Sequence, residues 1–154
     1  MLVDKYLTEL YEKTERTYFD DHSKYVFFAD VHRGDNSVSD EFAHNKNIYY
    51  YALAHYYSNG FTYVELGDGD ELWEQPRYDF IVDAHSIIFT LLKNFHEDGR
   101  LIMLYGNHNI QLRNAKYVEK YLSTYHDDYL DTDEPLLPGL KPAEALILKH
   151  EPSG

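Results

Sequence analysis

The chain contains no cysteine. A disulfide scaffold, thiolate metal ligands and a cysteine nucleophile are therefore all excluded. Positive charge is also scarce, because 14 Lys and Arg stand against 27 Asp and Glu and give a formal net charge of −13. Such a chain repels phosphate backbones, which excludes a basic surface that wraps nucleic acid. A phosphate-bearing substrate is still compatible with this acidity, because bound cations reverse the local sign of charge.

Long apolar runs are absent as well, so the sequence offers no membrane span. The amino terminus, Met1 to Lys5, has no signal-peptide pattern. We therefore expect a cytoplasmic protein. Its 154 residues, 44% hydrophobic and 27% charged, fit a single globular domain that spans residues 1–154.

Three short and almost wholly apolar runs, at residues 24–29, 61–66 and 101–105, predict strands that are buried on both faces. Apolar residues at helical spacing predict helices between them, over residues 39–59 and 78–96. This order indicates an α/β fold, βαβαβ, with a parallel sheet and both connecting helices on one of its faces.

The remaining segments flank this unit. Residues 3–16 read as an amphipathic helix, whose apolar stripe would cover part of the second sheet face. Ser37 or Ser39 is expected to cap the helix at 39–59, and Asn114 to cap a last helix. Residues 126–144 are acidic and contain proline, which predicts a loop, and residues 145–149 suggest a fourth strand.

Each predicted strand of the sheet runs into a polar loop with candidate metal ligands. The three motifs are Asp30-x-His32, Gly67-Asp68-x-x-Glu71 and Gly106-Asn107-His108. The carboxyl ends of parallel strands meet at one edge of a sheet, so these side chains are expected to lie together. Any one motif alone would read as an ordinary turn, but the coincidence of three indicates a metal site. Oxygen and imidazole donors suit Mn, Fe, Zn or Mg.

The residue types also suggest a chemistry for the site. Asp68, which comes from the middle loop, is placed to bridge two ions, and two-metal sites recur in the hydrolysis of phosphoesters. Asn107 would coordinate without adding charge. His108 would protonate a leaving oxygen or stabilise the oxygens of the reacting phosphoryl group.

The ordered triple motif, within residues 24 to about 113, resembles the calcineurin-like metallophosphoesterase superfamily and its UDP-diacylglucosamine hydrolase branch. The signature of that family is D-x-H, G-D-x-x-D and G-N-H-D/E, and Glu71-Leu72-Trp73 is similar to the Asp-Leu-Trp of the branch. The resemblance implies a phosphoesterase fold in which two sheets stack between helices, an αββα sandwich. This chain would form half of it.

The resemblance also implies roles for individual residues. Asp30, His32 and Asp68 would hold a first ion, and Asp68 with Asn107 would hold a second. His108 would be the acid or the transition-state stabiliser. Manganese is the metal expected first, with iron, zinc or magnesium as alternatives, and the substrate would be a phosphoester.

Three departures from the family pattern bear on activity. Glu71 replaces the Asp of the family pattern. Asn109 replaces the acid that follows Gly-Asn-His in the family, and a carboxylate at that position is expected to orient the imidazole of His108. The family also supplies three later histidines from a second half, whereas this chain continues only with His126 and His150. We therefore expect an amino-terminal half of a phosphoesterase that is inactive by itself.

Two other functions compete with hydrolysis. The first is a metal-binding or regulatory half-domain without catalysis, which the missing histidines favour. The second is a flavodoxin-like or receiver-like module, although such a module gives the Asn107–His108 pair no role. The sheet face left without a partner half predicts a homo-oligomer, most simply a two-fold dimer.

Other polar and aromatic residues carry weaker expectations. Arg33 would either contact a substrate phosphate or lie solvated in its loop, and the solvated loop is the favoured interpretation. Trp73 would line a substrate entrance or anchor its loop, and the role of Arg113 is equally open. The histidines on helices are expected to be exposed or at the edge of the core: His44, His55, His85 and His96.

Overall fold

The computed structural model describes residues 2–152. Its centre is a three-stranded sheet in the order β2-β3-β4. β2 (Tyr25–Phe28), β3 (Thr62–Leu66) and β4 (Leu101–Leu104) are all parallel. The α/β fold and the parallel βαβαβ order expected from the apolar runs are confirmed.

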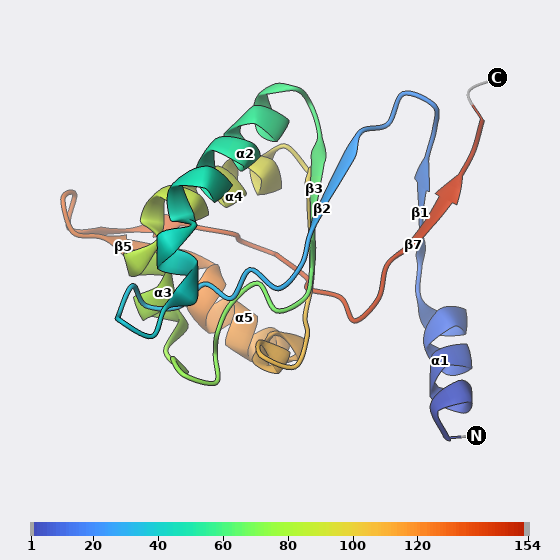
Figure 1. Cartoon of the computed structure of the whole chain (residues 1–154), viewed down its shortest axis with the longest axis horizontal. Coiled ribbons are helices and arrows are strands. Elements are labelled where there is room, and N and C mark those ends of the chain that lie inside the picture. The colour runs from blue at the N-terminus through green and yellow to red at the C-terminus, as the bar shows by residue number, and fades with distance from the viewer. Residues whose placement is uncertain (1, 153–154) are drawn as a thin grey trace.

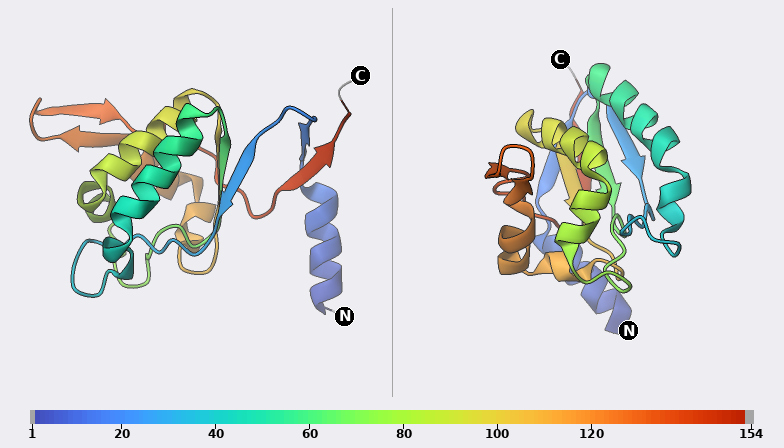
Figure 2. Two further views of the ribbon diagram at one scale, coloured as in Figure 1. Left: turned by 45° about the horizontal axis from the view of Figure 1, so that its top comes forward. Right: turned by 90° about the vertical axis from the view of Figure 1, so that its left-hand side faces the viewer.

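The helices that connect these strands lie on one face of the sheet, as expected (Figure 1). α2 (Lys46–Ser58) follows β2, and α3 (Tyr78–Ala84) and α4 (Ser86–Glu97) follow β3. α2 contacts β3 and α4, and α4 contacts β4. Figure 2 shows α2 and α4 side by side, to the left of the strands in its left view and in front of them in its right view.

The first helical segment starts later than expected, whereas the second starts at Tyr78 as expected but is divided in two. A 3-10 helix at Glu41–His44 precedes α2, and the side chain of Asp40, rather than Ser37 or Ser39, accepts from the backbone N–H of Ala43. The expected helix at 78–96 divides at His85, which is fully buried with its Nε2 2.8 Å from Asp40 Oδ2. The same buried pair therefore explains the cap and the break.

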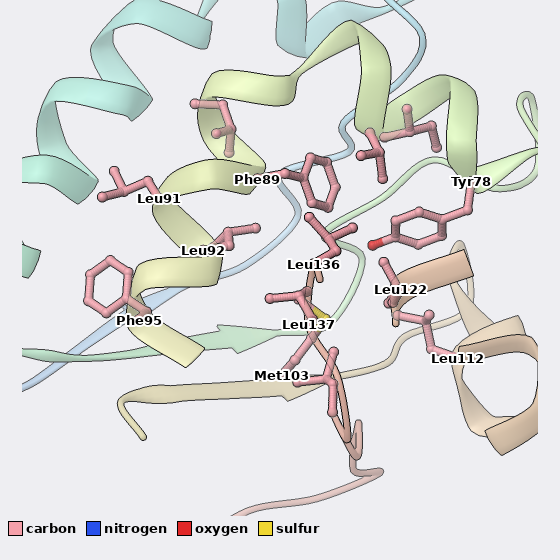
Figure 3. Close-up of a cluster of buried hydrophobic side chains, with 14 of the residues drawn as sticks. Tyr78, Phe89, Leu91, Leu92, Phe95, Met103, Leu112, Leu122, Leu136 and Leu137 are labelled. Carbon is pink, nitrogen blue, oxygen red and sulfur yellow. The ribbon is translucent and has the colours of Figure 1, made fainter. Parts of the chain in front are cut away.

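The hydrophobic core lies between the helices and the sheet. Figure 3 shows Phe89 and Leu92 of α4 facing Leu136, Leu137 and Met103. At the other end of the cluster, the core is completed by Tyr78, Leu112 and Leu122. The core therefore draws on a segment, residues 136–137, that sequence patterning assigned to a loop.

That segment follows a hairpin. β5 (Thr124–Asp127) and β6 (Thr132–Pro135) pair antiparallel, directly after α5 (Ala115–Leu122), whose expected cap by Asn114 is confirmed. The prediction of a loop throughout residues 126–144 is therefore wrong over the hairpin. The side chain of Asp127 accepts from the backbone N–H groups of Tyr129 and Leu130, which closes a turn that acidic composition alone does not reveal.

A second, smaller sheet lies on the side of the central sheet away from α2 (Figure 1). β1 (Arg16–Phe19) and β7 (Ile147–His150) pair in parallel, so the expected fourth strand exists but joins a different sheet. α1 (Leu2–Lys13) ends before residue 16, because residues 16–19 pair with β7 instead of continuing the helix.

The second face of the central sheet is only partly covered. Phe27 of β2 is 45% exposed, so the expectation that this strand is buried on both faces is wrong, although Val64 of β3 is fully buried. α1 does not provide the expected cover, because Val3, Leu7 and Tyr11 are each more than half exposed. The periodicity of α1 is amphipathic, but its stripe stays largely exposed, although Tyr6 donates to Glu144 and Arg16 lies over the ring of Tyr11. None of the helices in that range is long and apolar enough to cross a membrane.

Candidate metal centre

The three polar loops converge at one edge of the central sheet. The loops after β2 and β3 continue the parallel pairing past the strands, since His32 N–H donates to Asp68 O (2.9 Å) and Arg33 N–H to Gly69 O (2.9 Å). The loop after β4 joins them through the backbone N–H of His108, which donates to Asp68 Oδ1 (2.8 Å). The expected meeting of the strand-end motifs is therefore built by backbone hydrogen bonds.

Three ligand-type side chains meet there. His32, Asp68 and His108 each place one ligand atom so that all three atoms lie within 4.8 Å of one another. All three residues are partly buried. Two imidazoles and one carboxylate suit Zn, Mn or Fe, and fewer than four protein ligands leave positions open for water or substrate. This donor set could hold a divalent ion, but it contains His108, which was expected to act as the acid, in place of the expected ligands Asp30 and Asn107.

Glu71 connects the two histidines. Its Oε2 lies 2.6 Å from His108 Nδ1 and 3.1 Å from His32 Nδ1. If both rings donate through Nδ1, both Nε2 lone pairs stay free for a metal or a substrate. Partial burial alone would raise the pKa of Glu71, but the hydrogen bonds from His32 and His108 outweigh it and lower that pKa.

The carboxylate beside His108 is thus Glu71, and the expectation that residue 109 orients the ring is wrong. Asn109 is fully buried, and its Oδ1 accepts from the backbone N–H of Gly106 (2.7 Å). Its contribution is to shape the loop. The replacement of an acid by Asn109 therefore does not deprive His108 of a charged partner.

The backbone is strained at the expected ligands. Asp30, His32 and Asp68 have φ angles of 52°, 51° and 49°, in the left-handed region that side chains with a Cβ usually avoid. Strain of this kind persists where the surrounding structure forces it, and it gathers at functional sites. The three residues predicted to hold the first ion are all in this conformation.

This strain gives a testable consequence. Asp30→Gly is expected to increase the free energy of unfolding by about 1 kcal/mol, because glycine adopts a positive φ without strain. It is also expected to weaken metal binding at least tenfold. Asp131→Gly is the matched control, since Asp131 has the same φ of 52° and lies on the β5–β6 turn. Urea unfolding should show equal gains for the two variants, and calorimetry should show weakened metal binding only for Asp30→Gly.

Close approach of the loops also fixes Asp68. A Cβ on Gly106 would lie 2.2 Å from Asp68 Oδ1, so only glycine leaves room for that carboxylate. Gly67, at a φ of 98°, turns the chain immediately before it. The two glycines of the motifs therefore hold this candidate ligand in place.

The other predicted site residues lie at the margin of the cluster. Asp30 Oδ1 is 3.9 Å from His32 Nε2, although the Asp30 side chain is 74% exposed. Asn107 is exposed, and its backbone carbonyl accepts from the indole N–H of Trp73. Asp30 is thus near one residue of the cluster. Within residues 2–152, the side chain of Asn107 makes no hydrogen bond to the cluster.

Arg33 has neither of the roles considered from the sequence. It is fully buried, and its guanidinium binds both carboxylate oxygens of Glu65 at 2.7 and 2.8 Å and Asp70 Oδ1 at 2.8 Å. Tyr63 donates a further hydrogen bond to Glu65. The favoured interpretation of a solvated loop arginine is wrong. Arg33 instead links the loop after β2 to β3 and to the loop after β3 through buried ion pairs.

Sequence patterning missed the partners of Arg33. Glu65 lies inside an apolar strand, and a charged residue in such a run was itself a signal of a buried pair. Burial raises the pKa of Asp70, against the lowering effect of Arg33. Burial would also lower the pKa of Arg33, but Asp70 and Glu65 more than compensate and raise it.

The remaining candidate residues lie outside the centre. His126 pairs with Asp133 on the hairpin, and His150 pairs with Asp21. Arg113 is exposed beside a groove formed by α5 and residues 137–142. Of the histidines on helices, His44 and His55 are exposed as expected, whereas the complete burial of His85 was not.

A cleft of about 270 Å³ adjoins the centre and shares His32 and Glu71 with it. Its other lining side chains include Asp35, Asp40, Glu41 and Glu74. Carboxylates at this density repel anionic groups, so the cleft disfavours an anion on this side of the centre. No protein-family model, curated protein or solved structure matches the chain.

Proposed function

We propose that the chain carries the centre of a metal-dependent phosphoesterase. The observation that supports this most is that His32, Asp68 and His108 lie together at the carboxyl edge of a parallel sheet. Glu71 is hydrogen-bonded to both imidazoles. The motifs that resemble the calcineurin-like metallophosphoesterases supply all four residues. The β1–β7 pair also lies on the side of the central sheet where that resemblance expects a second sheet.

In this proposal His32 and Asp68 of the cluster would hold the first divalent ion together with the neighbouring Asp30, Asp68 with Asn107 would hold a second, and His108 would be left for the chemistry. The bound ions would polarise the phosphoryl oxygens and lower the pKa of a water molecule. His108, which is held through Nδ1 by Glu71, presents its opposite nitrogen to the leaving oxygen. The resemblance implies manganese first, with iron, zinc or magnesium as the alternatives, and the oxygen and imidazole donors are compatible with these ions.

The experiment is hydrolysis of bis(p-nitrophenyl) phosphate with manganese. Asp68→Asn should abolish any manganese-dependent turnover, because it removes the carboxylate shared by both ions. Asp128→Asn is the matched control, since the side chain of Asp128 is fully exposed on the hairpin. Manganese-dependent turnover above background that is unchanged in Asp68→Asn would contradict the proposal.

A metal-binding module without turnover is the second candidate. It is favoured by the positions of His126 and His150, which are paired elsewhere and leave the second ion with one shared carboxylate and one amide among the described residues. Such a pair is weak against the hydration of Mg or Mn. Under this alternative, calorimetry detects manganese while hydrolysis stays at background.

We also propose that the chain forms a two-fold dimer through its uncovered apolar surfaces. Phe27 on the sheet and Val3, Leu7 and Tyr11 on α1 are exposed by 45%, 68%, 55% and 60%. Large exposed apolar patches are uncommon on monomers, so these exposed side chains favour association. Light scattering at about 0.1 mM should give the mass of a dimer, because even micromolar affinity assembles most chains at that concentration. A monodisperse monomer would contradict this.

A further inference from the structure

Trp73, the only tryptophan of the chain, follows Glu71 and Leu72 in the loop after β3. Trp73 is 61% exposed, yet the residue makes three defined contacts, one through its backbone and two through its side chain. Its backbone N–H donates to Glu71 Oε1 (3.1 Å) and its indole N–H to Asn107 O (2.9 Å). Its ring stacks on His108, with the centroids 3.9 Å apart and the planes at 22°. All three partners are residues of the candidate centre.

Anchoring of the loop does not explain these contacts. Leu72, the preceding residue, is 2% exposed within the core and donates its backbone N–H to His108 O (3.1 Å). The loop is therefore already fixed to the core one residue earlier. A large indole that stays mostly in water adds little to core stability, since the hydrophobic gain scales with the apolar area removed from water.

The contacts instead complete the restraint on the imidazole of His108. Glu71 holds the ring at one atom, Nδ1, and His32 meets it edge-on with the centroids 4.5 Å apart at 90°. A ring held by one hydrogen bond can still tilt about that bond. The indole of Trp73 lies against one face of the ring and removes this freedom.

We propose that Trp73 is a positioning residue that fixes the plane of the His108 imidazole, so that its second nitrogen is aimed at the leaving oxygen. This inference rests on the proposed phosphoesterase function. A misplacement of about 1 Å in a catalytic group lowers the rate by about a hundredfold. The stack is therefore expected to affect turnover far more than stability.

The test compares Trp73→Ala, Trp73→Phe and Tyr129→Ala in the full chain. Tyr129 is 95% exposed on the hairpin, so its removal controls for the loss of a surface aromatic. Carbon-13 relaxation of the His108 ring should show an ordered ring in the unmodified chain, Trp73→Phe and Tyr129→Ala, and a mobile ring in Trp73→Ala. The melting temperatures of all four proteins should agree within about 2 °C. A ring as ordered in Trp73→Ala as in the unmodified chain overturns the proposal.

Kinetics separate this proposal from the proposed function. With manganese and bis(p-nitrophenyl) phosphate, Trp73→Ala should lower kcat by about tenfold to a hundredfold with KM unchanged, and Trp73→Phe should restore most of it. Unchanged kcat in Trp73→Ala overturns the inference and leaves the phosphoesterase standing. Absence of manganese-dependent turnover in the unmodified chain rules out hydrolysis by this chain alone, as the missing histidines lead us to expect, and the positioning of His108 is then decided by the relaxation measurement.

Discussion

Manganese at about 100 times its dissociation constant is expected to raise the melting temperature of the chain by about 5–10 °C. Binding to the folded state alone contributes about 2.7 kcal/mol at that excess. Each kcal/mol moves the melting temperature of a domain of this size by about 2–4 °C. The unfolded chain does not share this gain, because only folding brings His32, Asp68 and His108 together from three separate loops.

Asp68→Asn isolates the contribution of the metal. Asp68 Oδ1 accepts from the backbone N–H of His108, and the amide oxygen of Asn can accept the same bond. The variant should therefore melt close to the unmodified chain without metal and lose the shift produced by manganese. Asp128→Asn, with one exposed carboxylate fewer, should keep the full shift. Scanning calorimetry with and without manganese measures both, and an equal shift in the two variants would rule out a centre at Asp68.

The position of this centre was predictable because it depends on local pattern and on one rule of topology. Apolar runs that end in Gly, Asp, Asn and His predicted buried strands with polar loops, and parallel order places such loops at one edge. His32, Asp68 and His108 followed from that reasoning. Glu71 was recognised as part of a motif, but its reach to two imidazoles depends on side-chain geometry that spacing does not give.

The elements that were missed depend on contacts between distant parts of the chain. Residues 16–19 form a strand because residues 147–150 lie beside them, and their Thr, Tyr and Phe favour a strand without indicating this distant partner. The exposed stripe of α1 shows a related limit, since periodicity predicts an apolar face but not what covers it. Leu136 and Leu137 enter the core from a stretch whose prolines and acids predict a loop.

Arg33→Ala is expected to lower the free energy of unfolding by about 3–5 kcal/mol, the loss typical when one partner of a buried ion pair is removed. Arg33, Glu65 and Asp70 are all fully buried. The guanidinium makes three of its hydrogen bonds to the two carboxylates, so its loss leaves two buried acids without a cation. Such groups then either bind protons or admit water, and both cost stability.

Two comparison variants are expected to show that the loss of stability comes from the buried charge. Arg77→Ala removes an exposed arginine that pairs with Asp79, and it should change stability little, because such pairs are screened by solvent. Combining Arg33→Ala with Glu65→Gln and Asp70→Asn should recover part of the loss, since the stranded charges are then gone.

The loss in Arg33→Ala should extend to metal binding. Arg33 follows His32 directly, its backbone N–H donates to Gly69 O, and its carbonyl accepts from Glu71 N–H. The backbone of Arg33 and its buried side chain therefore both link the two loops that carry His32, Asp68 and Glu71. Urea unfolding measures the stability and calorimetry the affinity for manganese. If Arg33→Ala loses no more stability than Arg77→Ala, the buried triad is not what joins these loops.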